Sequence, residues 1–194
     1  MSSKKPDTRT RILEATWNLM EQRRGQGIRM GDIAKETGIS RQALYLHFKS
    51  RTELVIATVH YVDEIKGLEE RMARIRTAKN GTQLLESCIE EWGSYMPEIY
   101  GIAKALVSTR ETDPAAAVAW DGCMGCVKDL CHMAMAALQK EGNLAEGWSQ
   151  EEAAEALFIL ISFQSWEQLT VDMGWSTPQY VTQIKKLARS AFVA

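Results

Sequence analysis

Apolar side chains recur every three or four residues along almost the whole chain, which is the spacing of helices that bury one face. No segment shows a convincing alternation of apolar and polar residues, so no strand is expected. We therefore predict an all-α protein of about nine helices. The expected helices span residues 8–23, 30–37, 41–48, 51 to about 68, 81–96, 98–111, 114–140, 149–173 and 177–192.

The first 50 residues predict a compact group of three short helices. The first carries an apolar face at Ile12, Ala15, Leu19 and Met20 and stops at "RRGQG". The second turns its face inward through Ile33, Ala34 and Thr37. Gly38 then supplies a permissive backbone for a tight turn, and Ser40 is a good N-cap for the third helix, which packs through Leu44 and Phe48. This is the helix-turn-helix pattern.

The third helix leaves an unusual set of side chains outside its packed face: Arg41, Gln42, Tyr45, Leu46 and His47. Arginine suits the edge of guanine and glutamine suits the edge of adenine. Tyr45 and Lys49 are placed to reach phosphate oxygens. We therefore expect double-stranded DNA as the partner of this helix, although a plain three-helix packing unit would explain the glycine and the apolar residues.

Charge is distributed in agreement with that expectation. The net charge of −2 divides into ten basic and five acidic residues in positions 1–50, and 13 basic and 20 acidic residues in the remainder. A basic end on an acidic body indicates that this end meets a polyanion.

A helix-capping pattern follows directly after the third helix. Ser50 and Glu53 are spaced as a capping box, which opens a long fourth helix. Its expected apolar stripe is Leu54, Ala57, Thr58, Tyr61, Ile65 and Leu68. We place a functional boundary near residue 50, with a DNA-binding domain at 1–50 and a ligand-binding and dimerisation domain at 51–194.

The segments "IAKETGIS" and "LYLHFKSRTEL" together resemble the DNA-binding domain of the TetR family of transcriptional regulators over about residues 8–55. The resemblance implies a homodimer with two N-terminal reading heads and a small-molecule pocket in each C-terminal domain. By position, Tyr45 and Lys49 would hold phosphate. Arg41, Gln42 and Leu46 would choose the operator, with His47 beside them and Ser40 capping their helix.

One position departs from the family's pattern. The family usually begins the second helix with a threonine that caps it and touches phosphate, whereas this chain has Arg29, Met30 and Gly31. Arg29 replaces the phosphate contact by charge, but it has no acceptor with which to cap. The start of the second helix is therefore expected to be weakly held.

Two C-terminal segments predict a dimer interface. Residues 156–163, "ALFILISF", are apolar for two full turns and need cover on every side. The last helix is amphipathic, with Tyr180, Ile184, Leu187, Ala188 and Ala191 on one face. Two such helices from each of two chains would form a symmetric four-helix bundle. Completion of a monomeric core is the alternative.

Aromatic and methionine side chains gather after residue 90 and suggest a cavity for a hydrophobic or aromatic effector. An ordinary core would use the same residue types. The candidate pocket residues are Trp92, Tyr95, Met96, Trp120 and Met124, with Gln164 as a polar group.

The segment "CMGCVKDLCH" raises the possibility of a thiol switch or a soft-metal sensor at Cys123 and Cys126. Cys131 and His132 point to other sides of the same helix, so four ligands cannot surround a metal. We expect no metal site and no cofactor, and packing of the cysteines between helices is the simpler interpretation.

Other classes of protein find little support. The chain contains no HExxH, GxSxG or glycine-rich phosphate loop, so an enzyme is not expected. No apolar run approaches the length of a membrane span, and the polar N-terminus is unlike a secretory signal, which favours the cytoplasm. The predicted function is a ligand-responsive transcriptional regulator, most simply a repressor. The alternatives are a thiol- or metal-sensing regulator and a helical protein-interaction module that does not bind DNA.

Overall fold

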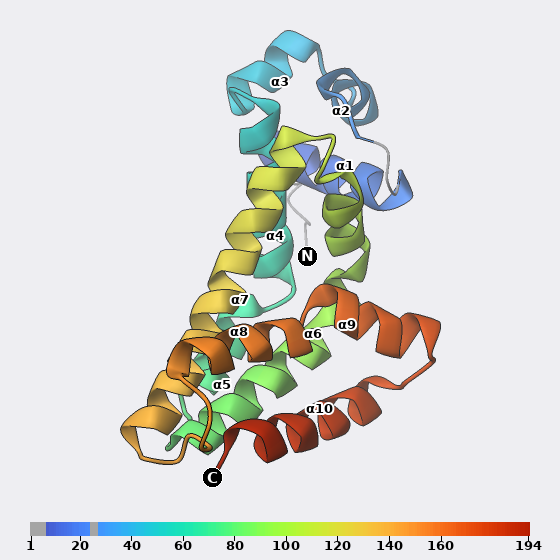
Figure 1. The fold of residues 1–194 in the computed structure, drawn as a ribbon. Helices are drawn as coiled ribbons and strands as arrows, with labels where there is room; N and C mark the ends of the chain where they lie inside the picture. The colour runs from blue at the N-terminus through green and yellow to red at the C-terminus, as the bar shows by residue number, and fades with distance from the viewer. Residues whose placement is uncertain (1–6, 24–26) are drawn as a thin grey trace, which may run out of the picture. The chain divides into compact units, whose positions relative to one another are not determined.

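The computed structural model describes residues 7–23 and 27–194, and these form ten α-helices and one π-helical turn (Figure 1). The described residues contain no strand, only an isolated bridge between Leu144 and Val193. The prediction of an all-α fold is confirmed. The first six residues of the N-terminal segment compared with a secretory signal, and the middle of "RRGQG", lie outside the described residues.

The chain divides into two compact units. The first unit comprises the residues up to Lys66 together with Ile99–Cys123, and the second comprises Gly67–Glu98 and Met124–Ala194. The long helices α6 (Gly81–Thr109) and α7 (Pro114–Lys140) each contribute to both units. The functional division at residue 50 is a separate matter and stays a prediction.

The first unit is built on α1 (Thr8–Gln22), α2 (Met30–Thr37), α3 (Arg41–His47) and α4 (Arg51–Ile65). Helix α1 packs against both α2 and α4, and α2 packs against α3 (Figure 1). The expected inward residues of these short helices are buried: Ile12, Ala15, Leu19, Met20, Ile33, Ala34, Thr37, Leu44 and Phe48. Periodicity alone therefore located this core.

The predicted stripe of the fourth helix was wrong in part. Its buried residues are Leu54, Val55, Thr58, Val59 and Val62, whereas Ile65 is exposed. The helix ends at Ile65 because Gly67 adopts a left-handed backbone, with φ of 69°, and a separate helix α5 (Leu68–Ile75) begins after it. Leu68 belongs to this helix, which the sequence analysis missed.

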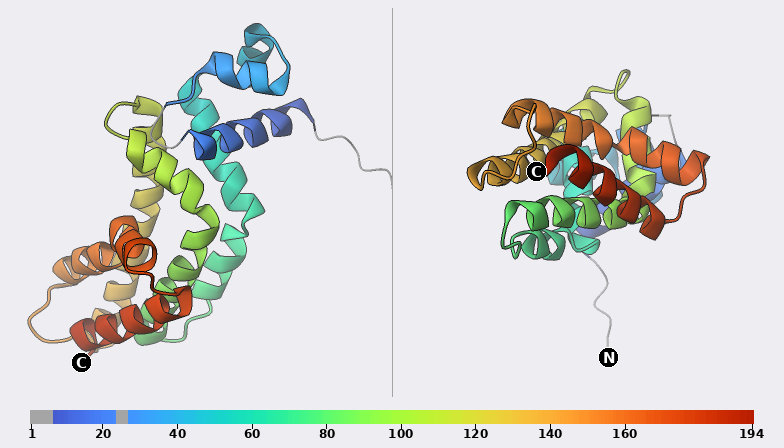
Figure 2. Two further views of the ribbon diagram at one scale, coloured as in Figure 1. Left: turned by 90° about the vertical axis from the view of Figure 1, so that its right-hand side faces the viewer. Right: turned by 60° about the horizontal axis from the view of Figure 1, so that its bottom comes forward.

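The second unit contains α5, α8 (Gln150–Leu160), α9 (Phe163–Glu167), the π-helical turn η1 (Gln168–Asp172) and α10 (Thr177–Phe192). Helix α10 packs against α8 and η1, and Figure 2 shows these elements beside one another in both views. Tyr180, Ile184, Ala188 and Phe192 form the buried face of α10.

Two predicted helix boundaries were wrong. Helix α6 continues through Pro97, although a proline in a helix removes one backbone hydrogen bond. Burial before and after it outweighs that loss, since Met96 and Ile102 are both buried. The predicted helix 149–173 is instead interrupted at Ser162, whose hydroxyl accepts from the Ser165 amide at 3.1 Å and caps α9.

None of the described helices is both long and apolar enough to cross a membrane.

Candidate nucleic-acid interface

The turn between α2 and α3 is closed by backbone hydrogen bonds. Gly38 has φ of 69°, a conformation that other residues rarely adopt. The Ile39 amide donates to the Ala34 carbonyl at 3.0 Å, and the Gly38 amide donates to the Lys35 carbonyl at 3.2 Å. This pair of bonds is the Schellman motif, which ends α2 sharply and sends the chain directly into α3.

Helix α3 is held by its cap and by its buried side chains. The Ser40 hydroxyl accepts from the Ala43 amide at 3.1 Å, as expected of an N-cap. Leu44 and Phe48 are completely buried, and the guanidinium of Arg9 lies 4.8 Å from the centre of the Phe48 ring. A cation over an aromatic face is favourable, so the contact between Arg9 and Phe48 helps to hold α3 against α1.

The opposite side of α3 faces solvent. Every residue predicted for DNA contact on or beside this helix is exposed: Ser40, Arg41, Gln42, Tyr45, Leu46, His47 and Lys49. Leu46 is the extreme case, with 88% of its surface accessible. The helix thus presents donors, an aromatic hydroxyl and an aliphatic side chain on one continuous face.

The start of α2 is better held than the sequence suggested. Arg29 is exposed and makes no side-chain cap, but the carboxylate of Asp32 accepts from the Arg29 amide at 3.2 Å. The same carboxylate pairs with Arg23 at 2.7 Å. These two contacts lower the pKa of Asp32, the amide contributing more than Arg23. The expectation of a weakly held start to α2 was therefore wrong, because Asp32 satisfies the orphan amide.

The capping signature at residues 50–53 forms in a modified way. The Ser50 hydroxyl accepts from the Glu53 amide at 3.0 Å, as predicted. The Glu53 carboxylate, however, accepts from the amide of Lys49 at 2.8 Å rather than from that of Ser50. The backbone of Lys49 is thereby fixed while its side chain remains exposed.

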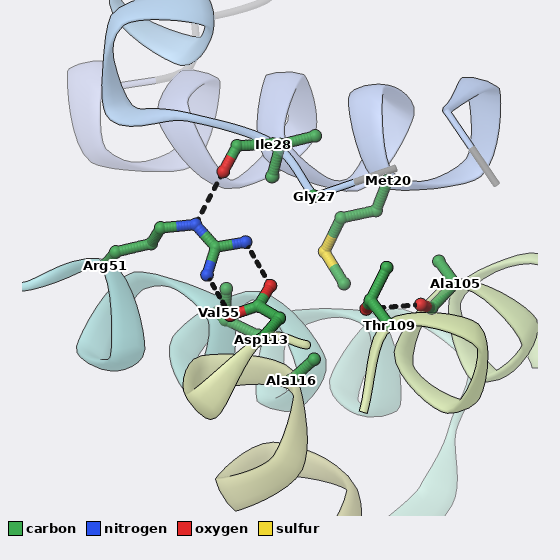
Figure 3. Close-up of a pocket in the computed structure, with 9 residues that line it drawn as sticks. All are labelled: Met20, Gly27, Ile28, Arg51, Val55, Ala105, Thr109, Asp113 and Ala116. Carbon is green, nitrogen blue, oxygen red and sulfur yellow. Dashed lines mark hydrogen bonds and ion pairs between the residues drawn. The ribbon is translucent and has the colours of Figure 1, made fainter. Parts of the chain in front are cut away.

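An ion pair fastens the chain just before α2 (Figure 3). Arg51, the first residue of α4, donates from Nε to the Ile28 carbonyl at 2.5 Å and binds the Asp113 carboxylate through both terminal nitrogens. Burial raises the pKa of Asp113, but the guanidinium outweighs it and holds that pKa below its usual value. The sequence analysis did not single out Asp113, because no sequence signal pairs residues 62 positions apart.

A small cavity of about 10 Å³ lies beside this ion pair, which is space for about one water molecule. It is lined by Met20, Gly27, Ile28, Arg51, Val55, Ala105, Thr109, Asp113 and Ala116. None of the six predicted pocket residues contributes to it.

Comparison with known proteins matches the same part of the chain. Residues 12–58 fit the family model of the bacterial regulatory proteins of the tetR family. Over residues 12–58 the chain therefore matches the TetR family. The matched segment includes α2, the Gly38 turn and α3, and therefore the whole exposed face described above.

One curated relative shows the extent of the sequence similarity. The chain is 38% identical over 64 residues to the nucleoid occlusion factor SlmA of Marinomonas sp. (strain MWYL1), a match that spans 33% of this chain and 32% of that protein. The chain thus spans about a third of the length of this relative.

Solved structures with 20% identity or less share the fold of nearly the whole chain. A transcriptional regulator from Saccharomonospora viridis in complex with choline superposes with a TM-score of 0.74, covering 96% of this chain and 97% of its own, at 20% identity. The regulator FadR from Bacillus subtilis in complex with stearoyl-CoA gives 0.74 at 16% identity, covering 94% and 98%.

The six residues predicted to contact an effector are divided between the two units. Trp120 is a buried residue of the first unit, and the other five belong to the second. Trp92, on α6, donates from its indole nitrogen to the Ile161 carbonyl at 2.6 Å. The guanidinium of Arg71 lies 5.0 Å from the centre of the buried Tyr95 ring.

The remaining candidates differ in their exposure. Met96 is almost completely buried and Met124 is half-buried, whereas Gln164 on α9 is exposed. Their role in binding an effector stays a prediction.

The four cysteines separate into two kinds. Cys88 and Cys131 are buried in the second unit, and burial raises the pKa of each thiol to about 12. Cys126 is exposed and Cys123 is half-buried, both on α7. Within the described residues, no cluster of three potential metal ligands occurs. Any thiol chemistry at neutral pH would therefore fall to Cys123 and Cys126, because only the thiolate is reactive.

Proposed function

We propose that this protein is a regulator of the TetR family that is dimeric, responds to a ligand, and represses transcription by binding a palindromic operator. The observation that supports it most is the exposed face of α3, opposite the buried Leu44 and Phe48. Gln42 is suited to adenine and Arg41 to guanine, while Tyr45 and Lys49 lie where phosphates would pass. Two such helices, one from each subunit, would enter successive major grooves.

Dimerisation is supported by apolar side chains that remain exposed in the second unit. Ile159 on α8 and Met173 after η1 are 64% and 67% accessible, and Val171 and Leu187 are about half accessible. Soluble proteins rarely leave a group of large apolar side chains on neighbouring elements uncovered. A second copy that contributes the same elements would cover them by two-fold symmetry.

The proposed signal is a small hydrophobic or aromatic molecule that binds the C-terminal domain, with Trp92, Tyr95, Met96, Trp120 and Met124 as the candidate contacts and Gln164 as a polar one. Proteins of the same fold have been solved with choline and with stearoyl-CoA, which shows that the fold accepts chemically different ligands. Release from DNA requires that the effector bind the non-binding conformer more tightly, since equal affinity would shift nothing.

A thiol signal is the second candidate, and it is favoured by the exposure of Cys126. Replacement of Cys123 and Cys126 by serine separates the two signals. The double variant should keep its release by an organic effector and lose release by thiol reagents such as diamide. The buried Cys88 and Cys131 are unchanged in this variant and serve as the internal control.

The deciding experiment is selection of bound DNA from random fragments with the purified protein at moderate salt. Enrichment of an inverted repeat, with half-sites about one helical turn or a multiple of it apart, is the expected result. Affinity should also fall steeply with salt, because each phosphate contact releases counterions. The proposal would be overturned if a folded dimer enriched no DNA sequence and its weak affinity for DNA did not change with salt concentration. That result would favour a protein-interaction module.

A further inference from the structure

The outermost side chain of the proposed recognition helix is aliphatic rather than polar. Leu46 is 88% accessible, more than any other large apolar side chain among the described residues. Folding alone gives no reason for a leucine in this position, because exposing an apolar side chain to water is unfavourable. A contact that buries it in the functional complex would supply the reason.

The geometry of α3 directs Leu46 away from the core. At 3.6 residues per turn, Leu46 lies about 200° around the helix from the fully buried Leu44. Gln42 lies four residues earlier and only about 40° from Leu46, so these two side chains share the outward ridge. Both are exposed. Tyr45 and His47 lie to either side of this ridge.

In the major groove, the 5-methyl group of thymine is the apolar feature that distinguishes one base from the others. The two carbons of an isobutyl terminus cannot form hydrogen bonds, so Leu46 cannot recognise a donor or an acceptor. We infer that Leu46 selects thymine in each half-site by contact with its 5-methyl group. This inference rests on the proposed function. It states which base Leu46 recognises, at a protein position whose residue varies within the family.

The inference also fixes where the thymine lies. Gln42 and Leu46 are separated by four residues, or about 6 Å along the helix. This distance corresponds to about two base-pair steps of 3.4 Å. If Gln42 reads an adenine, the thymine read by Leu46 should therefore lie within about two base pairs of it.

Deoxyuridine provides the test, because it differs from thymidine only in lacking the 5-methyl group. Using the operator obtained by selection, each thymine of the half-site is replaced in turn, in both half-sites. The wild-type protein should lose about fourfold in affinity per half-site at one particular thymine, the value for one buried methyl group. The other replacements should have little effect.

Two variants separate this contact from others. In Leu46→Ala the loss caused by deoxyuridine should disappear, while Gln42→Ala should retain it. Since Leu46 is exposed, Leu46→Ala should melt as the wild type does, which checks that the variant is folded.

Three results would overturn the inference while leaving the proposed function intact: a selected half-site without thymine, no sensitive position in the wild type, or undiminished sensitivity in Leu46→Ala. Failure to select any operator would instead reject the proposed function and this inference with it.

Discussion

Gln42 and Lys49 are both exposed and polar, but they lie at different places on the proposed DNA-binding surface. Gln42 lies on the outward ridge of α3, where on the proposed function a side chain would meet base edges. Lys49 follows the helix, where its backbone is fixed by Glu53. The two residues should therefore contribute to affinity in different ways.

The first prediction compares Gln42→Ala with Lys49→Ala. Loss of a bidentate contact to adenine should remove about 1–3 kcal/mol of preference at particular base pairs. Loss of Lys49 should weaken binding to all sequences alike and reduce the salt slope by about one. Titration of both variants against the operator and its single-base-pair mutants measures the two effects. If both variants lose affinity uniformly, the orientation of α3 assumed above is incorrect.

Two helical glycines give the second prediction, since their surroundings are opposite. A Cβ at Gly81 would lie 2.7 Å from the backbone nitrogen of Leu138, whereas one at Gly125 would meet nothing within 4 Å. Gly81→Ala should therefore destabilise the protein by about 1–3 kcal/mol through overpacking. Gly125→Ala should stabilise it by about 0.5–1 kcal/mol by limiting the unfolded chain. Denaturant unfolding of both variants measures these changes, and equal effects would contradict the close approach of Gly81 to the backbone of Leu138.

At the scale of elements, an ion pair between Arg51 and Asp113 joins α4 to the turn between α6 and α7. Arg51 and Asp113 keep only 25% and 11% of their side-chain surface accessible. Removing one member leaves the other largely buried without its charge partner, which costs more than loss of an exposed pair.

The third prediction follows from this difference in burial. Arg51→Ala should lower the free energy of unfolding by about 1–3 kcal/mol. The matched control is Arg23→Ala, which breaks the more exposed pair with Asp32 and should cost less than Arg51→Ala, because solvent screens an exposed pair. Similar losses in the two variants would show that the buried pair contributes no more than a surface one.

Acid should remove the contribution of Asp113. Because its pKa in the folded protein is lowered from 3.8, its carboxylate stabilises the fold fully above that value, and the stabilisation is lost as the pH falls through the lower folded pKa. The fourth prediction is that wild type exceeds Asp113→Asn in unfolding free energy at neutral pH, and that this difference shrinks below pH 3.8. A difference that stays constant across this range would exclude the ion pair as its cause.

For the whole molecule, the exposed apolar side chains of the second unit predict the oligomeric state. The wild type should sediment at twice the 21.8 kDa mass of the chain. Ile159→Glu and Leu187→Glu place charges in the proposed interface, so each should shift the protein toward monomer and weaken operator binding. Val118→Glu is the control, because Val118 is as exposed as Leu187 but belongs to the first unit. Dimers that survive both interface variants would place the interface elsewhere.

Local patterns in the sequence were sufficient where neighbouring residues decide the structure. Gly38 in its left-handed turn, the serine caps at 40 and 50 and the buried pair Leu44 and Phe48 all formed as predicted. These features depend on backbone conformation and on contacts within a few residues, so a sequence pattern specifies them. The same locality explains why the exposed face of α3 was predicted residue by residue.

Only the tertiary structure decided the rest, because it depends on residues far apart in the chain. Helix α6 continues through Pro97, and the buried face of α4 includes Val55, Val59 and Val62. Tertiary burial decided both features, and the sequence analysis predicted neither. The pairing of Arg51 with Asp113 joins positions that no local pattern relates. The sequence by itself therefore determined the helical fold class and the exposed face of α3, whereas packing determined where helices end and which distant residues hold them together.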